Sequence, residues 1–145
     1  MFKIDSYLFF DGDCADAMRF YQRTLGGEIE MMMTYGESPD KEQIPKGGED
    51  RILHASLRIG EMRLLASDCS PGEPYDGMKG FSLSLSYPTP EEAKSMFKKL
   101  SDGGKVSLPI GPTFWSDAFG MLVDQFGTPW MISGGEMKSD QSNNS

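Results

Sequence analysis

Apolar and polar residues along the chain predict the same succession of elements twice. Residues 6–10 form a largely apolar, aromatic run typical of a strand, and helical spacing follows from Asp13 to Leu25. About 76 positions later, residues 82–86 alternate in the manner of a strand, and a helix is predicted from Thr89 to Leu100. Each helix is followed by three further predicted strands, at residues 28–34, 51–59 and 61–67 in the first half, and from Val106, at 119–124 and at 130–133 in the second. The pattern therefore predicts an α+β fold of two βαβββ units.

Polar residues and glycines mark the ends of both predicted helices. Asp13 is a suitable N-cap for the first helix, and Gly26-Gly27 ends it. The second helix has a stronger start, because Thr89 as N-cap precedes Pro90 at the first helical position and Glu92 three residues after the cap. These capping residues predict the same helix boundaries as the spacing of the apolar residues.

The repeat also sets the expected domain organisation. Residues 1–68 form the first unit, 69–78 a Pro/Gly-rich linker and 79–134 the second unit, together making one structural domain. Residues 135–145, rich in Ser, Asn and Asp toward the end, are expected to be a disordered tail. The long loop 36–50 is of the kind that is often functional or mobile.

The charge and apolar content of the chain limit the classes of partner that it could bind. The net charge of −8 and pI near 4.6 argue against nucleic acid, which requires a basic face to neutralise phosphates. No stretch approaches the roughly 20 apolar residues of a membrane span. The first residues lack the apolar core of a signal peptide, so we expect a cytoplasmic protein in which Cys14 and Cys69 remain reduced thiols.

Several short segments, in their order and spacing, resemble those of a known superfamily. The similarity runs from Tyr7 to Ile132. The segments that carry it are Asp11–Ala17 with Phe20-Tyr21 and Leu25–Gly27, Tyr35–Pro39, Thr113–Trp115, Phe119–Met121 and Asp124–Met131. The chain resembles the vicinal oxygen chelate superfamily, which includes glyoxalase I, extradiol dioxygenases and bleomycin-resistance proteins, and within it the PhnB-like branch.

The resemblance implies curved mixed sheets that enclose a cavity, with a metal held by His, Glu or Gln on the first and fourth strands of each unit. Counting from the helix caps and the glycine-anchored hairpins places these positions at Ser6, Leu65, Ser82 and Met131. Neutral side chains of these types do not form a divalent-metal site, and among their neighbours only Asp5 could coordinate. We therefore predict no cofactor and no metal ligand, with a divalent metal at an atypical site left open.

The single histidine is the main candidate for chemistry. His54 lies on the strand face predicted to point into the cavity, where it could contact a ligand, transfer a proton or bind a metal with nearby carboxylates. A surface or hydrogen-bonded structural role is the simpler interpretation. Glu37 is the second catalytic candidate and Arg58 a charged ligand contact, although solvated side chains of these types are more common.

Other residues could line a ligand pocket. Ser82, Ser84 and Ser86 share one strand face, which is either a solvent-facing surface or the polar wall of a pocket. Leu8 and Phe10 are expected to supply apolar surface opposite. Phe114 and Trp115 lie in a loop, where they either contact a ligand or partner or anchor the loop.

Three classes of function remain open. The leading hypothesis is a metal-free protein that binds a small molecule in a cavity lined by Ser6, Leu8, Phe10, His54, Arg58, Leu65, Ser82, Ser84, Phe114, Trp115 and Met131. The second is a lyase, isomerase or dioxygenase-type enzyme with an atypical metal or an acid–base site at His54 or Glu37. The third is an interaction protein whose sheet surface mainly forms a homodimer.

Overall fold

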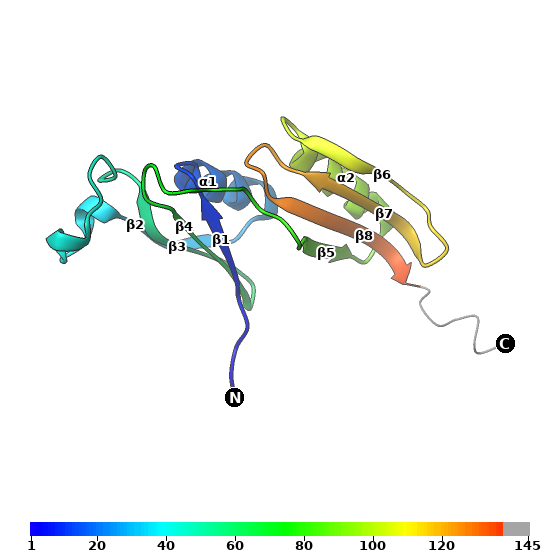
Figure 1. Cartoon of the computed structure of the whole chain (residues 1–145). Coiled ribbons are helices and arrows are strands. Elements are labelled where there is room, and N and C mark those ends of the chain that lie inside the picture. Colours follow the sequence, from blue (N-terminus) through cyan, green and yellow to red (C-terminus); the bar gives the residue numbers. More distant parts are fainter. Residues whose placement is uncertain (138–145) are drawn as a thin grey trace. The chain divides into compact units, whose positions relative to one another are not determined.

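The computed structural model describes residues 1–137 and divides the chain into two compact units (Figure 1). Unit 1 is Met1–Gly77, and unit 2 begins at Met78. Each unit contains one α-helix and one four-stranded mixed sheet. The predicted α+β fold of two βαβββ units is confirmed.

Unit 1 is built from one helix packed on one face of its sheet (Figure 1). Its sheet has the order β1-β4-β3-β2, in which β1 runs parallel to β4 and the other neighbours are antiparallel. The elements are β1 (Ser6–Phe10), α1 (Cys14–Leu25), β2 (Glu28–Thr34), the 3-10 helices η1 (Tyr35–Glu37) and η2 (Lys41–Gln43), β3 (Ile52–Ile59) and β4 (Met62–Asp68).

Up to Met137, where the described residues end, unit 2 repeats this topology without 3-10 helices. Its sheet order is β5-β8-β7-β6, with β5 parallel to β8. The elements are β5 (Leu83–Tyr87), α2 (Pro90–Ser101), β6 (Lys105–Gly111), β7 (Ser116–Val123) and β8 (Pro129–Met137).

The last strand pair is longer than the sequence predicted. β7 begins at Ser116 instead of Phe119, and β8 continues to Met137, which pairs with Ser116. Residues 135–137, expected to belong to the tail, are therefore part of the sheet. Pairing with β7 orders residues 135–137 as a strand. The sequence did not indicate this strand, because glycines such as Gly134 and Gly135 are unfavourable within strands. The remainder of the expected tail, 138–145, lies outside the described residues.

The core of unit 1 lies between α1 and one face of its sheet. Met18 and Tyr21 of α1 are fully buried, as is Leu57 of β3. Leu8 and Phe10 of β1 face the same core, with only 2% and 1% of their surface exposed. The prediction that Leu8 and Phe10 line a ligand cavity is wrong, because side chains alternate along a strand and these two lie on the helix side.

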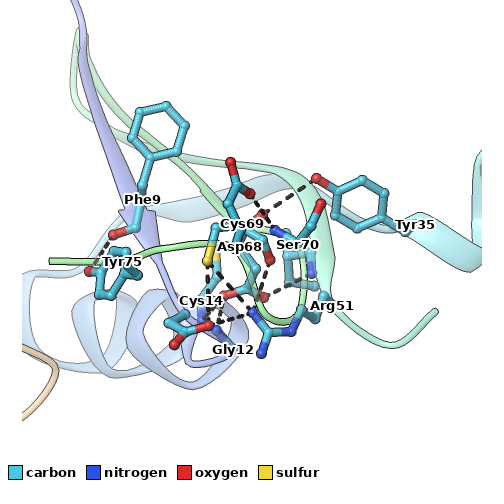
Figure 2. A network of polar contacts seen from close by, with 12 residues as sticks. Phe9, Gly12, Cys14, Tyr35, Arg51, Asp68, Cys69, Ser70 and Tyr75 are labelled. Atoms are coloured by element: carbon cyan, nitrogen blue, oxygen red, sulfur yellow. Dashed lines mark hydrogen bonds and ion pairs between the residues drawn. The ribbon is translucent and has the colours of Figure 1, made fainter. Parts of the chain in front are cut away.

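A buried carboxylate, and not the expected N-cap, satisfies the start of α1. Asp13 occupies the N-cap position but makes no side-chain capping bond. Instead, Asp68 Oδ1 at the end of β4 accepts hydrogen bonds from the backbone N–H groups of Gly12 (2.8 Å) and Cys14 (3.0 Å). Its Oδ2 accepts from Ile52 N (2.9 Å). Asp68 therefore ties β4 to both α1 and β3 (Figure 2).

Unit 2 shows the capping that its sequence predicts. Thr89 Oγ1 accepts from the backbone N–H of Glu92, and Pro90 opens α2. At the other end of the sheet, the Asp124 carboxylate accepts from Thr128 N and from the indole of Trp130. These bonds fix the β7–β8 turn and place Trp130 in the core.

Candidate functional site

The sheet of unit 1 has one face that α1 does not cover, here called the helix-free face. Strand alternation places there the neighbours of the buried core residues. Tyr7 and Ser56 both pair with Leu65, and Met33 pairs with His54. The side chains on this face include Tyr7, Phe9, Met31, Met33, His54, Ser56, Arg58 and Leu65.

Tyr7, Phe9 and His54 form an aromatic cluster at one end of the helix-free face. The Tyr7 hydroxyl and His54 Nδ1 share a hydrogen bond of 3.1 Å, and the ring centroids of these two residues are 5.7 Å apart. The rings of Tyr7 and Phe9 lie 5.0 Å apart at an angle of 38°. Tyr7 is 39% exposed and Phe9 57% exposed, so the cluster offers both apolar ring surface and one polar pair.

Two further tyrosines hold the backbone beside the aromatic cluster (Figure 2). The Tyr75 hydroxyl donates to the Phe9 carbonyl at 2.7 Å. The Tyr35 hydroxyl donates to the Asp68 carbonyl at 3.4 Å. Burial raises the pKa of Tyr35, and the Glu73 carboxylate, the Tyr7 phenol and the Asp68 carboxylate raise it further. Tyr35 thus remains a neutral donor near the cluster.

The cysteines lie near this region but are poor nucleophiles. Burial raises the pKa of the Cys69 thiol, and its hydrogen bond to Asp11 adds to the effect. Burial also raises the pKa of Cys14, far above its ordinary value. Because the thiolate is the reactive form, neither thiol is activated for attack.

Arg51 is held in place by two residues, Asp11 and Cys69 (Figure 2). Its Nη1 donates to Asp11 Oδ1 at 2.7 Å and to the Cys69 carbonyl at 2.9 Å, and it lies 3.8 Å from Cys69 Sγ. The guanidinium holds the pKa of Asp11 below its usual range. Arg51 therefore joins the start of β3 to the loops that follow β1 and β4.

Arg58 lies at the opposite end of the helix-free face, where acidic side chains neutralise it. Its Nε donates to Glu30 Oε2 at 3.1 Å and its Nη2 to Glu28 Oε2 at 3.3 Å. Arg63 donates to the other oxygen of Glu30 at 2.8 Å. Arg58 is thus on the predicted face, but its charge is engaged by carboxylates and it is separated along β3 from His54.

Glu37 has a local structural role. It closes a capping box at η1, in which its Oε1 accepts from Thr34 N (3.0 Å) and Thr34 Oγ1 (2.9 Å). The backbone and side-chain bonds from Thr34 lower the pKa of Glu37. A carboxylate with a lowered pKa is a weaker base, which counts against a catalytic role.

Unit 2 presents serines on the face opposite α2. Ser84 pairs with Met131, and Ser86 pairs with Ser133, their hydroxyl oxygens being 3.3 Å apart. Ser84 and Ser86 are exposed, and Met131 is half-buried. Ser82 precedes β5. The serine row of the sequence is therefore one face of an edge strand.

The aromatic loop of unit 2 begins just before β7. Phe114 is 87% exposed and meets Trp115 edge-on, with ring centroids 4.7 Å apart. Trp115 in turn meets Phe119 at 5.4 Å. The loop is closed by bonds between Thr113 and Ser116. Trp115 therefore anchors the loop on the sheet, whereas Phe114 extends into solvent.

Strand register shows which of the four positions expected from the resemblance lie side by side. The first-strand residue beside Leu65 is Tyr7, and the one beside Met131 is Ser84. Ser6 instead pairs with buried Leu64, so it is at the exposed end of β1 on the helix side. Counting back from the helix caps missed this because the two loops between first strand and helix need not have equal length.

Neither pair of neighbouring positions supplies metal ligands. Tyr7 and Leu65 in unit 1, and Ser84 and Met131 in unit 2, offer no imidazole or carboxylate. Within the described residues, no three His, Cys, Asp or Glu side chains come together as ligands would. The side chains at these four positions therefore do not fit a divalent ion.

Comparison with known proteins assigns the family. The model of the Glyoxalase/Bleomycin resistance protein/Dioxygenase superfamily matches residues 3–132. The chain belongs to this superfamily. The resemblance found in the sequence is thereby confirmed.

Similar proteins within the superfamily include PhnB-like members. Protein YjdN of Escherichia coli (strain K12) is 37% identical over 138 residues, which are 90% of this chain and 93% of YjdN. The crystal structure of protein PA1353 from Pseudomonas aeruginosa is 42% identical, with a TM-score of 0.86, covering 93% of this chain and 98% of that one. The PhnB protein from Bacillus cereus is 27% identical, with a TM-score of 0.77 and coverage of 92% and 100%.

The aromatic cluster was not expected from the sequence. Of β1, the residues expected at the site were Ser6, Leu8 and Phe10, and both faces of this strand are apolar. The helix spacing alone could not decide which face of the sheet α1 covers.

No helix in the described part of the chain has the length and apolarity needed to cross a membrane.

Proposed function

We propose that this protein binds a small organic molecule on the helix-free face of unit 1 without a divalent metal. The observation that carries the proposal is the aromatic cluster. Its exposed rings of Tyr7 and Phe9 provide apolar contact area, and the Tyr7–His54 hydrogen bond provides donor and acceptor atoms. Ligand sites commonly combine a mostly apolar lining with a few placed polar groups.

The chemistry of the donors supports a metal-independent mode of binding. The four positions where the superfamily would hold a metal carry phenol, hydroxyl and apolar side chains. Imidazole and carboxylate are the ligands that suit divalent ions in such sites. His54 would then contact the ligand directly.

The serine face of unit 2 is proposed as a second contact surface. Ser84, Ser86 and Ser133 offer hydroxyls beside Met131, and Phe119 pairs with Ser133. Hydroxyls next to an apolar surface suit hydrogen-bonding groups of a neutral molecule.

Acid–base catalysis is the second candidate function, and the Tyr7–His54 pair is the observation that favours it. When Nδ1 accepts from Tyr7, Nε2 carries the proton and can donate to a substrate. Turnover that persists in His54→Ala would contradict this role. Glu37 is not retained as a base, because its carboxylate closes the capping box at η1.

We further propose a cytoplasmic homodimer. The support for self-association is apolar surface, since Met31, Met62 and Phe114 are 45%, 68% and 87% exposed. Light scattering coupled to size-exclusion chromatography should give twice the chain mass. A monomer at the concentrations used for binding would contradict the dimer.

The first prediction tests binding without metal. Protein purified from unsupplemented medium should contain far less than one equivalent of Zn, Mn, Ni or Fe by elemental analysis. Titration with benzamide, an aromatic ring carrying a neutral amide, should shift the NMR signals of Tyr7, Phe9 and His54. Phe9→Leu should weaken binding about fivefold, which corresponds to about 1 kcal/mol for a lost aromatic contact.

Phe114→Leu is the matched control, because it removes another exposed ring from unit 2. It should leave the benzamide affinity unchanged. One equivalent of metal that disappears in His54→Ala would contradict metal-free binding. Benzamide shifts absent from the helix-free face of unit 1 would contradict the location of the site.

A further inference from the structure

We propose that the molecule bound at the aromatic cluster is an organic cation carrying an alkylated ammonium group. The inference rests on the proposed function and specifies the chemical class of ligand. Exposed aromatic rings lie on the helix-free face, the Glu73 carboxylate lies in the turn after β4, and Arg51 and Lys41 are engaged by other groups. The argument combines these two features of unit 1.

The turn that follows β4 carries the negatively charged side chain of Glu73. Glu73 is fixed in this turn, where its Oε2 accepts from Ser70 N at 2.9 Å and its own N–H donates to the Ser70 carbonyl at 3.0 Å. Tyr35 links the turn to the cluster, since its hydroxyl bonds to the Asp68 carbonyl and lies in the field of Glu73, Tyr7 and Asp68. The Asp68 carboxylate itself is buried against α1 and β3, so Glu73 supplies the negative charge of this turn.

The basic groups of these segments do not cancel that charge. The Arg51 guanidinium is bonded to the Asp11 carboxylate at 2.7 Å. Lys41 Nζ donates to the Gly36 carbonyl at 3.0 Å. Both cations are thus engaged, and the Glu73 carboxylate would repel an anionic ligand. The overall charge of −8 adds to the attraction for cations.

The rings supply the specific part of the recognition. The negative face of an aromatic ring attracts a cation placed within about 6 Å of its centre. Tyr7 and Phe9, 5.0 Å apart and tilted by 38°, expose two such rings side by side. An alkylated ammonium also buries methyl groups against them, which a strongly hydrated inorganic ion cannot do.

The test compares two probes of nearly equal shape and different charge. Choline carries a trimethylammonium group, and 3,3-dimethylbutan-1-ol is its neutral carbon isostere. Choline should shift the NMR signals of Tyr7 and Phe9 with an affinity at least about fivefold higher than that of the neutral isostere, because cation–π attraction at exposed sites has about this strength. Raising the salt concentration should reduce the difference.

Substitutions distinguish the contribution of the Glu73 charge to choline binding from that of the aromatic rings. Glu73→Gln keeps an oxygen acceptor for Ser70 N and removes the charge, so it should reduce the preference for choline at least about twofold. Glu91→Gln, on α2 of unit 2, is the control and should leave it unchanged. Phe9→Leu should weaken choline binding more than Phe114→Leu.

Equal affinities for choline and its neutral isostere would overturn the inference. Choline shifts confined to unit 2, or insensitivity to Glu73→Gln, would also overturn it. If benzamide still binds at the aromatic cluster in these cases, the proposed function stands and only the cationic class fails. If neither benzamide nor choline binds there, the proposed function fails as well.

Discussion

Asp68→Ala is expected to destabilise unit 1 by about 4 kcal/mol. The Asp68 carboxylate is 2% exposed and accepts three backbone N–H groups, from Gly12, Cys14 and Ile52. Removing it leaves these buried donors without their acceptor, and each hydrogen bond to a charged group contributes about 1.5–3 kcal/mol, partly offset by relaxation and water. Chemical denaturation followed by far-UV circular dichroism measures the loss.

Two further variants test whether the capping bonds of Asp68 cause this loss of stability. Asp68→Asn keeps Oδ1 for Gly12 and Cys14 but places an amide N–H₂ toward Ile52 N, so about half the loss, about 2 kcal/mol, is expected. Asp13→Ala should cost less than about 1 kcal/mol, because Asp13 makes no side-chain capping bond and acts only through the helix dipole. A larger loss in Asp13→Ala than in Asp68→Ala would contradict the assignment of the cap.

Loss of Asp68 should also disturb the candidate site. Asp68 pairs with Phe10 in the parallel β1–β4 ladder, and its carbonyl accepts the Tyr35 hydroxyl. Both contacts lie next to the aromatic cluster. Benzamide affinity should therefore fall in Asp68→Ala even at temperatures where the variant remains folded.

Gly27→Ala is expected to cost about 3 kcal/mol, the second large effect. Gly27 has a φ of +92°, which an L residue rarely adopts, and an added Cβ would collide with the carbonyl oxygen of Arg58. The collision is with backbone, so no side-chain rotation can relieve it. Moving β2 away from β3 to make room would weaken their ladder, and overpacking of this kind costs about 1–3 kcal/mol beyond the φ penalty.

The neighbouring glycine provides a matched control. Gly26 has a similar φ of +87°, but a Cβ there would meet nothing within 4 Å. Gly26→Ala should therefore show only the penalty for its backbone conformation (φ +87°, ψ −166°), about 1–2 kcal/mol and less than the cost of Gly27→Ala. Thermal unfolding of both variants measures the difference, and equal losses would show that the close approach to Arg58 has no energetic role.

Helices and strands could be predicted because their signals are local. The cap at Thr89, the glycines after the first helix and the period of the apolar residues all act within a few positions. They placed α1 and α2 within one residue of the observed bounds. The extension of β8 to Met137 was missed because cross-strand pairing with Ser116, and no residue preference of its own, orders that segment.

The candidate site depended on contacts that are distant in the chain. The Tyr7–His54 hydrogen bond joins positions 47 residues apart, and Asp68 reaches Cys14 across 54. Spacing within either segment contains no information on such pairs. The sequence placed His54 on the face of β3 opposite Ala55 and Leu57, since that strand has one clearly apolar side, and this face is the helix-free face. β1 has two apolar sides. For that reason Leu8 and Phe10 were expected on the face that Tyr7 and Phe9 occupy.

By itself, the sequence determined the repeated βαβββ pattern and the neutral residues Leu65 and Met131 on the fourth strands. Both follow from local periodicity and from the chemistry of individual side chains. Only the tertiary structure decided which face of β1 remains uncovered by α1, which residue caps that helix and which side chain His54 meets. The physical reason is that burial by a packed helix and hydrogen bonds between separate strands arise only when distant segments come together.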